Sequence, residues 1–216
     1  MTARTGQANL IRRLRGMAQV GTADYSIVMG DGSTAVWWSD NYLADILDSF
    51  RKDYQGVTLS PAPEYIGGTT TFHNYYAPDA NWEEANSGSV YWLVTDSLGA
   101  DPGTANYTAD YIKGEIRFTA DRGGTAYYLT GRTYNLNGAA AQLWREKAGN
   151  TAAFYNFQTD NQSFSRSDWH KHCIEMAKYY DAENGFKSVR LKRDDLYPAG
   201  GGTVWHRQGN NKGWDY

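Results

Sequence analysis

The residues best suited to metal binding lie in the run His170-Lys171-His172-Cys173. Residues two apart on a helix point in different directions, so His170 and His172 would not face the same side. His170 and Cys173 are three apart and share a helix face, but they supply two ligands where a zinc site needs three or four. We therefore expect no metal site and no cofactor.

Patterns typical of catalysis are equally sparse. Glu83 and Glu84 are adjacent carboxylates in an expected loop, and we interpret them as a solvated pair rather than an acid/base dyad. Residues 30–33, GDGS, have neither the following lysine nor the flanking strand and helix of a phosphate-binding loop. The Gly-x-Ser-x-Gly motif of a nucleophile elbow is absent. We expect no catalytic residues and predict that the chain is not an enzyme.

Aromatic side chains are abundant, with 17 Tyr and 8 Trp. They bury a large apolar body while keeping one polar atom, which suits half-hydrated surfaces and interfaces, and they also fill β-rich cores. Both interpretations stay open from the residues alone. If the aromatic residues form a binding surface, a sugar-binding platform would consist of Tyr75, Tyr76, Trp82, Tyr91 and Trp92.

Charge is unevenly distributed along the 216 residues, although the net charge is only −3. Residues 1–20 hold four arginines, Arg4, Arg12, Arg13 and Arg15, without an acidic residue, and the segment from 185 is also basic. Basic ends suit nucleic acid or an acidic protein partner. Because no nucleic-acid-binding motif is present, we favour the protein partner.

The compartment and the relation to membranes follow from a few further observations. The single cysteine, Cys173, excludes an internal disulfide and suggests a reducing compartment. No apolar run approaches the ~18 residues of a membrane span. We expect a protein made in a cytoplasm, with no membrane contact.

The elements that would position these residues begin with helices. Three-and-four spacing of apolar residues predicts helices over 2–19, over 36–54 with a cap at Ser39 or Asp40, and two more within 133–180. A polar hinge joins the last two, and Ser165 is placed to cap the second of them. From Gly56 the period changes to two, which predicts strands. They are 57–59, 69–72, 90–94, 114–118 and 126–130, with the last two joined by a hairpin turn at 121–124.

These elements predict an α+β fold in three parts. Residues 1–55 and 135–184 would form a helical bundle of about four helices, and residues 56–134 would be a small antiparallel β module inserted into it. Residues 185–216 combine glycine runs with spaced apolar residues, which predicts an extended C-terminal tail buried on another molecule. The alternative is that this tail packs on its own domain.

Several segments, taken in order along the chain, form a recognisable series. They are Trp38–Asp48, Tyr107–Phe118 with its Tyr-x-x-Asp-Tyr-x-x-Gly-x-Ile-x-Phe pattern, Gly138–Ala141, Tyr155–Asp160 and Gln162–Ser167. Together they resemble the head-tail connector (portal adaptor) proteins of long-tailed bacteriophages. The resemblance covers about two-thirds of the chain, and the aromatic-rich stretch 61–88 and the end beyond Pro198 depart from it.

The resemblance implies a structural virion protein located in the neck, at the head–tail interface. It would form a ring, usually of twelve copies, that sits beneath the capsid portal, joins it to the next neck or tail protein and lines a channel through which DNA passes transiently. The partners would be the portal protein, the downstream neck or tail protein and further copies of the chain. A different neck component, such as a stopper or tail-completion protein, and a carbohydrate-binding protein are the alternatives.

In such a ring the C-terminal segment would reach the portal. Its basic residues would meet an acidic portal surface, and its apolar and aromatic residues would fill pockets as interface anchors. The predicted portal-binding residues are Arg190, Lys192, Arg193, Leu196, Tyr197, Trp205 and Trp214.

Overall fold

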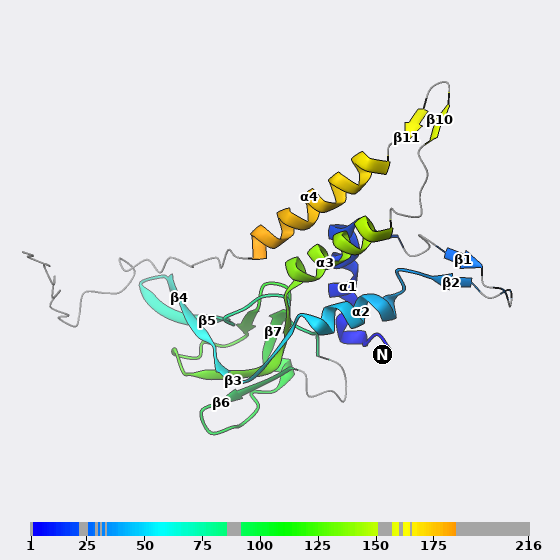
Figure 1. Ribbon diagram of the computed structural model, residues 1–216. Helices are drawn as coiled ribbons and strands as arrows, with labels where there is room; N and C mark the ends of the chain where they lie inside the picture. The colour runs from blue at the N-terminus through cyan, green and yellow to red at the C-terminus, as the bar shows by residue number, and fades with distance from the viewer. Residues whose placement is uncertain are drawn as a thin grey trace, which may run out of the picture. The chain divides into compact units, whose positions relative to one another are not determined.

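The computed structural model describes residues 2–21, 26–28, 30, 32, 34–85, 92–150, 157–159, 162–164 and 166–184. The chain divides into one compact unit, Met1–Phe186, and a second unit, Lys187–Tyr216, which lies outside the described residues. The described helices of the first unit are α1 (Ala8–Ala18), α2 (Asp40–Ser49), α3 (Leu136–Asn150) and α4 (Arg166–Asn184), with short 3-10 helices η1 (Thr5–Gln7) and η2 (Thr104–Asn106) (Figure 1).

Two antiparallel sheets make up the β part of the described chain. The three-stranded sheet has the order β3 (Arg51–Thr58), β9 (Tyr127–Tyr134), β6 (Trp92–Asp96). The four-stranded sheet has the order β4 (Ser60–Ile66), β5 (Thr69–Tyr76), β8 (Glu115–Phe118), β7 (Tyr107–Asp110). Two separate hairpins pair β1 (Ser26–Val28) with β2 (Thr34–Val36) and β10 (Phe157–Thr159) with β11 (Gln162–Phe164).

Alternation along the strands builds an aromatic core that both sheets share. Tyr75 of β5 pairs in register with Ile116 of β8, and neither side chain is exposed. Their neighbours Asn74 and Arg117 pair with each other and therefore lie on the opposite face. The buried residues of this sheet core are Leu59, Tyr75, Ala77, Trp82, Trp92, Val94, Ile116, Phe118, Tyr127 and Leu129.

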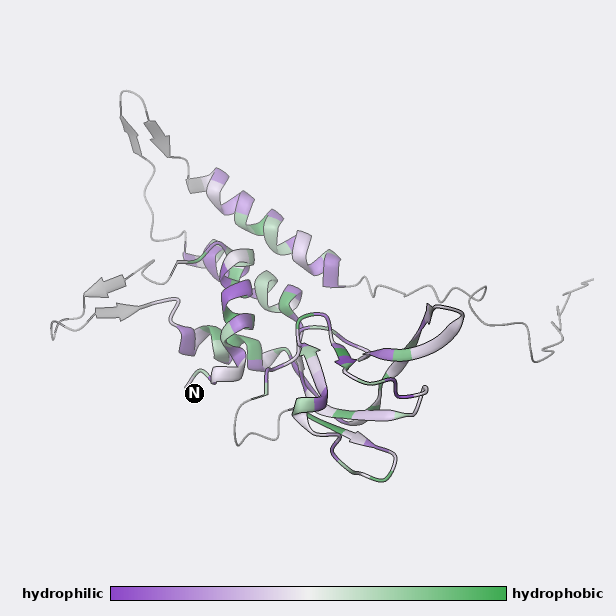
Figure 2. Cartoon of the chain, turned by 180° about the vertical axis from the view of Figure 1, so that it is seen from behind, coloured by the Kyte–Doolittle hydropathy of each residue, from purple (hydrophilic) through white to green (hydrophobic). Residues whose placement is uncertain are grey.

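A second core lies between α1, α2 and the first half of α3. The predicted apolar stripes of α1 and α2 are buried in it, and Ser39 caps α2 by accepting a hydrogen bond from the backbone N–H of Tyr42, as predicted. Hydrophobic and hydrophilic segments share each helix in Figure 2, as amphipathic helices require. The members are Leu10, Ile11, Leu14, Ala18, Val20, Trp38, Leu43, Ala44, Ile46, Leu47, Tyr134, Leu136, Ala139, Ala140 and Leu143.

The predicted helical bundle is wrong, although the α+β class is right. Helix α4 packs on α3 through a separate cluster of Trp144, Ala148, Cys173 and Ala177, and only Tyr180 of α4 reaches the edge of the core formed by α1, α2 and α3. The four helices therefore do not surround one common core. The strands β3–β9 lie between α2 and α3 in the chain, and their two sheets have a core of their own in which five of the ten buried residues are aromatic.

Several strand boundaries also differ from the predictions. Strand β3 begins at Arg51, directly after α2, where the helical spacing of apolar residues predicted helix to residue 54. Strands β4 and β7 were not predicted at all. Residues 121–124 do not close a hairpin, because β8 and β9 belong to different sheets. Part of the predicted hinge forms the β10–β11 hairpin, whereas Ser165 lies outside the described residues.

We predict that Gly138→Ala destabilises the fold. A Cβ at this position of α3 would lie 2.7 Å from Cδ1 of Phe50, so either the ring or the helix must shift. Overpacking of this kind costs about 1–3 kcal/mol of unfolding free energy, measured by urea denaturation. The matched control is Gly149→Ala in the same helix, where no atom lies within 4 Å of the new Cβ and helix propensity favours alanine. Equal effects of the two substitutions would contradict the prediction.

Candidate functional site

The predicted portal-binding residues cannot be placed by the structure. Arg190, Lys192, Arg193, Leu196, Tyr197, Trp205 and Trp214 all lie outside the described residues.

The candidate metal ligands are divided between solvent and core. His170 and His172 are exposed, and Cys173 is fully buried against α3. Burial raises the pKa of the Cys173 thiol, although the nearby Lys147 charge opposes this effect. The ring of His172 lies between two indoles, 5.6 Å from Trp144 and 5.5 Å from Trp169 between ring centroids. Within the described residues, no three His, Cys, Asp or Glu side chains are grouped so that they could hold a metal ion.

Most of the aromatic residues proposed as a sugar platform lie in the sheet core. Tyr75 and Trp82 have no exposed surface and Trp92 is 6 % exposed, whereas Tyr91 lies outside the described residues. Trp82 packs edge-to-face on Trp92, with ring centroids 5.6 Å apart. A sugar cannot reach three of the five residues.

Glu83 is not the solvated residue that its loop position suggested. Only 1 % of it is exposed, because its carboxylate lies inside a polar cluster that we call the Arg4 cluster, formed by Arg4, Gln7, Asp48, Glu83 and Tyr134. Arg4 donates through Nη1 and Nη2 to the two Asp48 oxygens at 2.9 and 2.6 Å, and through Nε to Glu83 Oε1 at 2.9 Å. The adjacent residues Glu83 and Glu84 therefore have different partners, because Glu84 accepts a hydrogen bond from the Asn9 side-chain amide.

The electrostatics of the Arg4 cluster favour the charged forms of Arg4 and Asp48. Hydrogen bonds from Arg4 to Asp48, and then to Glu83, raise the arginine pKa further above its ordinary value despite burial. Burial by itself raises the pKa of the Asp48 carboxyl, but the hydrogen bonds and charge of Arg4 outweigh it, so the net pKa is lowered. Burial and the hydrogen bond donated to Glu83 (2.6 Å) raise the pKa of Tyr134. This cluster is structural, since each polar group is engaged with another.

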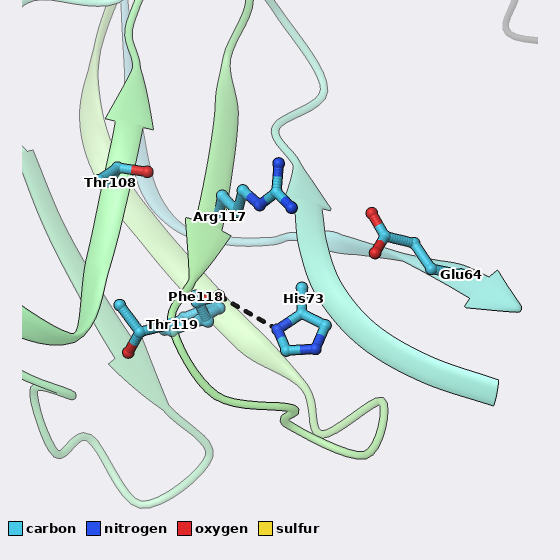
Figure 3. A pocket seen from close by; sticks show the side chains of 6 residues that line it. All are labelled: Glu64, His73, Thr108, Arg117, Phe118 and Thr119. Carbon is cyan, nitrogen blue, oxygen red and sulfur yellow. Dashed lines mark hydrogen bonds between the residues drawn. The ribbon is translucent and has the colours of Figure 1, made fainter. Parts of the chain in front are cut away.

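Polar side chains converge on a hollow of about 280 Å³ at the four-stranded sheet. Figure 3 shows Arg117 of β8, His73 of β5 and Glu64 of β4 around it. The remaining lining residues are Thr108, Phe118 and Thr119. Strand alternation explains the hollow's polarity, because Asn74 and Thr108 flank Arg117 in register on this face.

The groups around the hollow are equipped for binding. His73 Nδ1 lies 3.2 Å from the carbonyl oxygen of Phe118, so Nδ1 carries the proton and Nε2 is left as an acceptor in the neutral ring. Glu64 accepts from the Asn74 amide, and the Thr119 hydroxyl donates to the Asn106 carbonyl at 3.1 Å. Among the lining residues, the hydroxyls of Thr108 and Thr119 form no hydrogen bond with His73 or Glu64. The sequence signal for this face is the alternation of inward and outward residues in β5 and β8.

The basic N-terminal helix is partly neutralised. Arg4 belongs to the Arg4 cluster. Arg15 Nη2 lies 2.7 Å from Asp40 and also donates to the carbonyl of Trp38, and Arg15 Nη1 donates to the carbonyl of Gly21. Arg12 and Arg13 are exposed, and Arg12 lines an open groove of about 420 Å³ between α1 and the start of α2. The arginines are thus not one solvent-facing basic patch.

Comparisons with protein-family models, with curated proteins and with solved structures find no match for this chain. Among the described helices, none combines the length and apolar character needed to cross a bilayer.

We predict that Asp48→Asn lowers stability at pH 7 and that the difference from the natural protein shrinks in acid. The folded-state pKa of Asp48 is lowered, so its contribution is complete above the unfolded pKa of about 3.9 and is lost as pH falls below that value. Loss of hydrogen bonds to a charged group costs about 1.5–3 kcal/mol, measured by denaturant unfolding at several pH values.

Asp45→Asn is the control, since Asp45 lies on the exposed side of the same helix. A stability gap between Asp48→Asn and the natural protein that stayed constant from pH 7 to 3 would rule out the assigned role.

Proposed function

We propose that this chain is a ring subunit of the neck of a long-tailed bacteriophage, where it connects the capsid portal to the next neck or tail protein. The observation that carries the proposal is the order of the sequence segments that resemble head-tail connector proteins, from Trp38–Asp48 to Gln162–Ser167. No one segment is specific, and the support lies in their common order.

Two of these segments hold positions that shape the fold, which supports their use as markers. In Tyr107–Phe118, Asp110 accepts hydrogen bonds from the backbone N–H groups of Ile112 and Lys113 in the turn between β7 and β8. Gly114 has φ +68°, and a Cβ there would lie 2.4 Å from the carbonyl oxygen of Asp79, so only glycine fits. In Gly138–Ala141 every residue is buried, and the absence of a side chain at Gly138 leaves room for the ring of Phe50.

The alternatives receive less support. Burial of Tyr75, Trp82 and Trp92 leaves carbohydrate binding without its platform. A stopper or tail-completion role differs from the connector role by position in the particle, so imaging of intact particles distinguishes them.

Removal of all residues after Gly185 is expected to abolish portal binding while the rest of the chain folds. Met1–Phe186 forms its own compact unit, and the deleted segment contains all seven predicted portal-binding residues. Circular dichroism would establish folding, and co-sedimentation with purified portal would measure binding. Trp205→Ala and Trp214→Ala in the full chain test single anchors, each expected to weaken binding by about tenfold. Full portal affinity of the truncated protein would refute the assignment.

The free protein is expected to bind DNA weakly or not at all. DNA must slide through such a ring, so strong contacts would oppose function, and two of the four N-terminal arginines are held in ion pairs. Gel-shift assays at about 50 and 200 mM salt are the measurement. A tight complex that weakens steeply with salt would contradict the connector proposal.

A further inference from the structure

Strand β6 leaves one edge of the three-stranded sheet without a strand partner among the described residues. The order is β3-β9-β6, and β6 pairs through Trp92–Asp96 with β9 alone. An edge of this kind presents backbone N–H and C=O groups that can pair with another extended segment. Figure 1 shows β6 at the border of the sheet.

The other sheet edges carry features that discourage such pairing, and β6 does not. Strand β4 has Pro61 and Pro63 and an irregular register between Ala62 and Glu64. Strand β3 begins with exposed Arg51 and Lys52 and has a register shift between Tyr54 and Val57. Prolines, charges and bulges are the usual protection of edge strands.

Strand β7 is the remaining edge, and it ends in the ion pair between Asp110 and Lys113. The β6 sequence Trp-Leu-Val-Thr-Asp has no proline and no basic residue, and its register with β9 is unbroken.

Apolar side chains are held in solvent along the same strand and the turn after it. Leu93 is 40 % exposed on the face opposite the buried Trp92 and Val94, and Leu98 is 90 % exposed. The turn is well ordered by hydrogen bonds, since Asp96 Oδ1 accepts from the N–H groups of Leu98 at 2.8 Å and Ala100 at 2.9 Å. Leu98 is therefore presented by a constrained turn.

We propose that the β6 edge binds residues 188–193 of a second copy of this chain as an added strand. The sequence Ser-Val-Arg-Leu-Lys-Arg alternates apolar and polar residues, which is the pattern of a strand with one covered face. Val189 and Leu191 would lie on the face of the exposed Leu93, and Arg190 and Lys192 on the opposite face, which Asp96 shares. The segment is basic, whereas Asp96 and Asp101 stand at the end of β6, so the charges are complementary.

This inference rests on the proposed function in taking a second copy as the partner. It also divides the C-terminal segment into two parts. Residues 188–193 would join neighbouring subunits, and Leu196, Tyr197, Trp205 and Trp214 would remain for the portal.

Disulfide trapping in the full-length protein tests the contact. A Leu93→Cys variant is mixed with a Leu191→Cys variant and oxidised, with Val189→Cys used in the same way for the alternative register. The control replaces Leu93→Cys by Thr58→Cys, an exposed position on β3 at the other edge of the same sheet. The native Cys173 is buried, so the natural protein provides the blank. We expect about tenfold more cross-linked dimer with Leu93→Cys than with Thr58→Cys.

The proposal is overturned if Leu93→Cys and Thr58→Cys give equal amounts of cross-linked dimer, or if neither gives any. A chain carrying both Leu93→Cys and Leu191→Cys that cross-links within itself at high dilution shows that the occupant is its own segment, which also overturns it. Leu93→Lys provides a second measurement and should weaken self-association in sedimentation by about tenfold. Its control is Tyr65→Lys, at a position 74 % exposed. Because no portal is present, these results are independent of the portal-binding test.

Discussion

The Arg4 guanidinium is the contact on which the arrangement of helices and sheets depends. The helical core and the sheet core are separate clusters, and Arg4 binds Asp48 at the end of α2 while also binding Glu83 beside β9. Tyr134 closes the cluster by donating to Glu83 while its ring lies in the helical core. Charges buried together give little net stability, but removal of one leaves the others unpaired. Through Arg4, the cluster therefore links the end of α2 to Glu83 beside β9.

A second polar junction attaches the C-terminal helices to α1. Carbonyl groups at the end of a helix lack intrahelical partners, and here those of Met17, Ala18 and Gln19 accept from α3 and α4. Trp144 Nε1 and the Tyr180 hydroxyl each donate to Met17 at 3.1 Å, and Lys147 donates to Ala18 and Gln19. Lys147 is only 5 % exposed, and the negative end of the α1 dipole compensates its buried charge. This junction explains how α4 is held although it contributes little to the main helical core.

The helices were predictable because their spacing is local, whereas the sheets depend on partners distant in sequence. The apolar residues Phe50 and Tyr54 continued the stripe of α2, yet pairing with β9 draws residues from Arg51 onward into a strand. Strand β4 escaped prediction because Pro61 and Pro63 argue against a central strand, and its place at an edge removes that objection. Nothing local in residues 121–124 distinguishes a hairpin from a link between two sheets.

The difference between local spacing and pairing of distant residues also decides which parts of the candidate sites could be predicted. Aromatic composition cannot separate a surface platform from a core, and here the register of β5, β6 and β8 turns Tyr75 and Trp92 inward. The polar hollow around Arg117 requires strands that are neighbours only after folding. Since the core uses the largest aromatic residues, binding must use the groups left outside. The edge of β6, which has no strand partner among the described residues, is the most consequential of these, because backbone groups at an edge can pair with another extended segment.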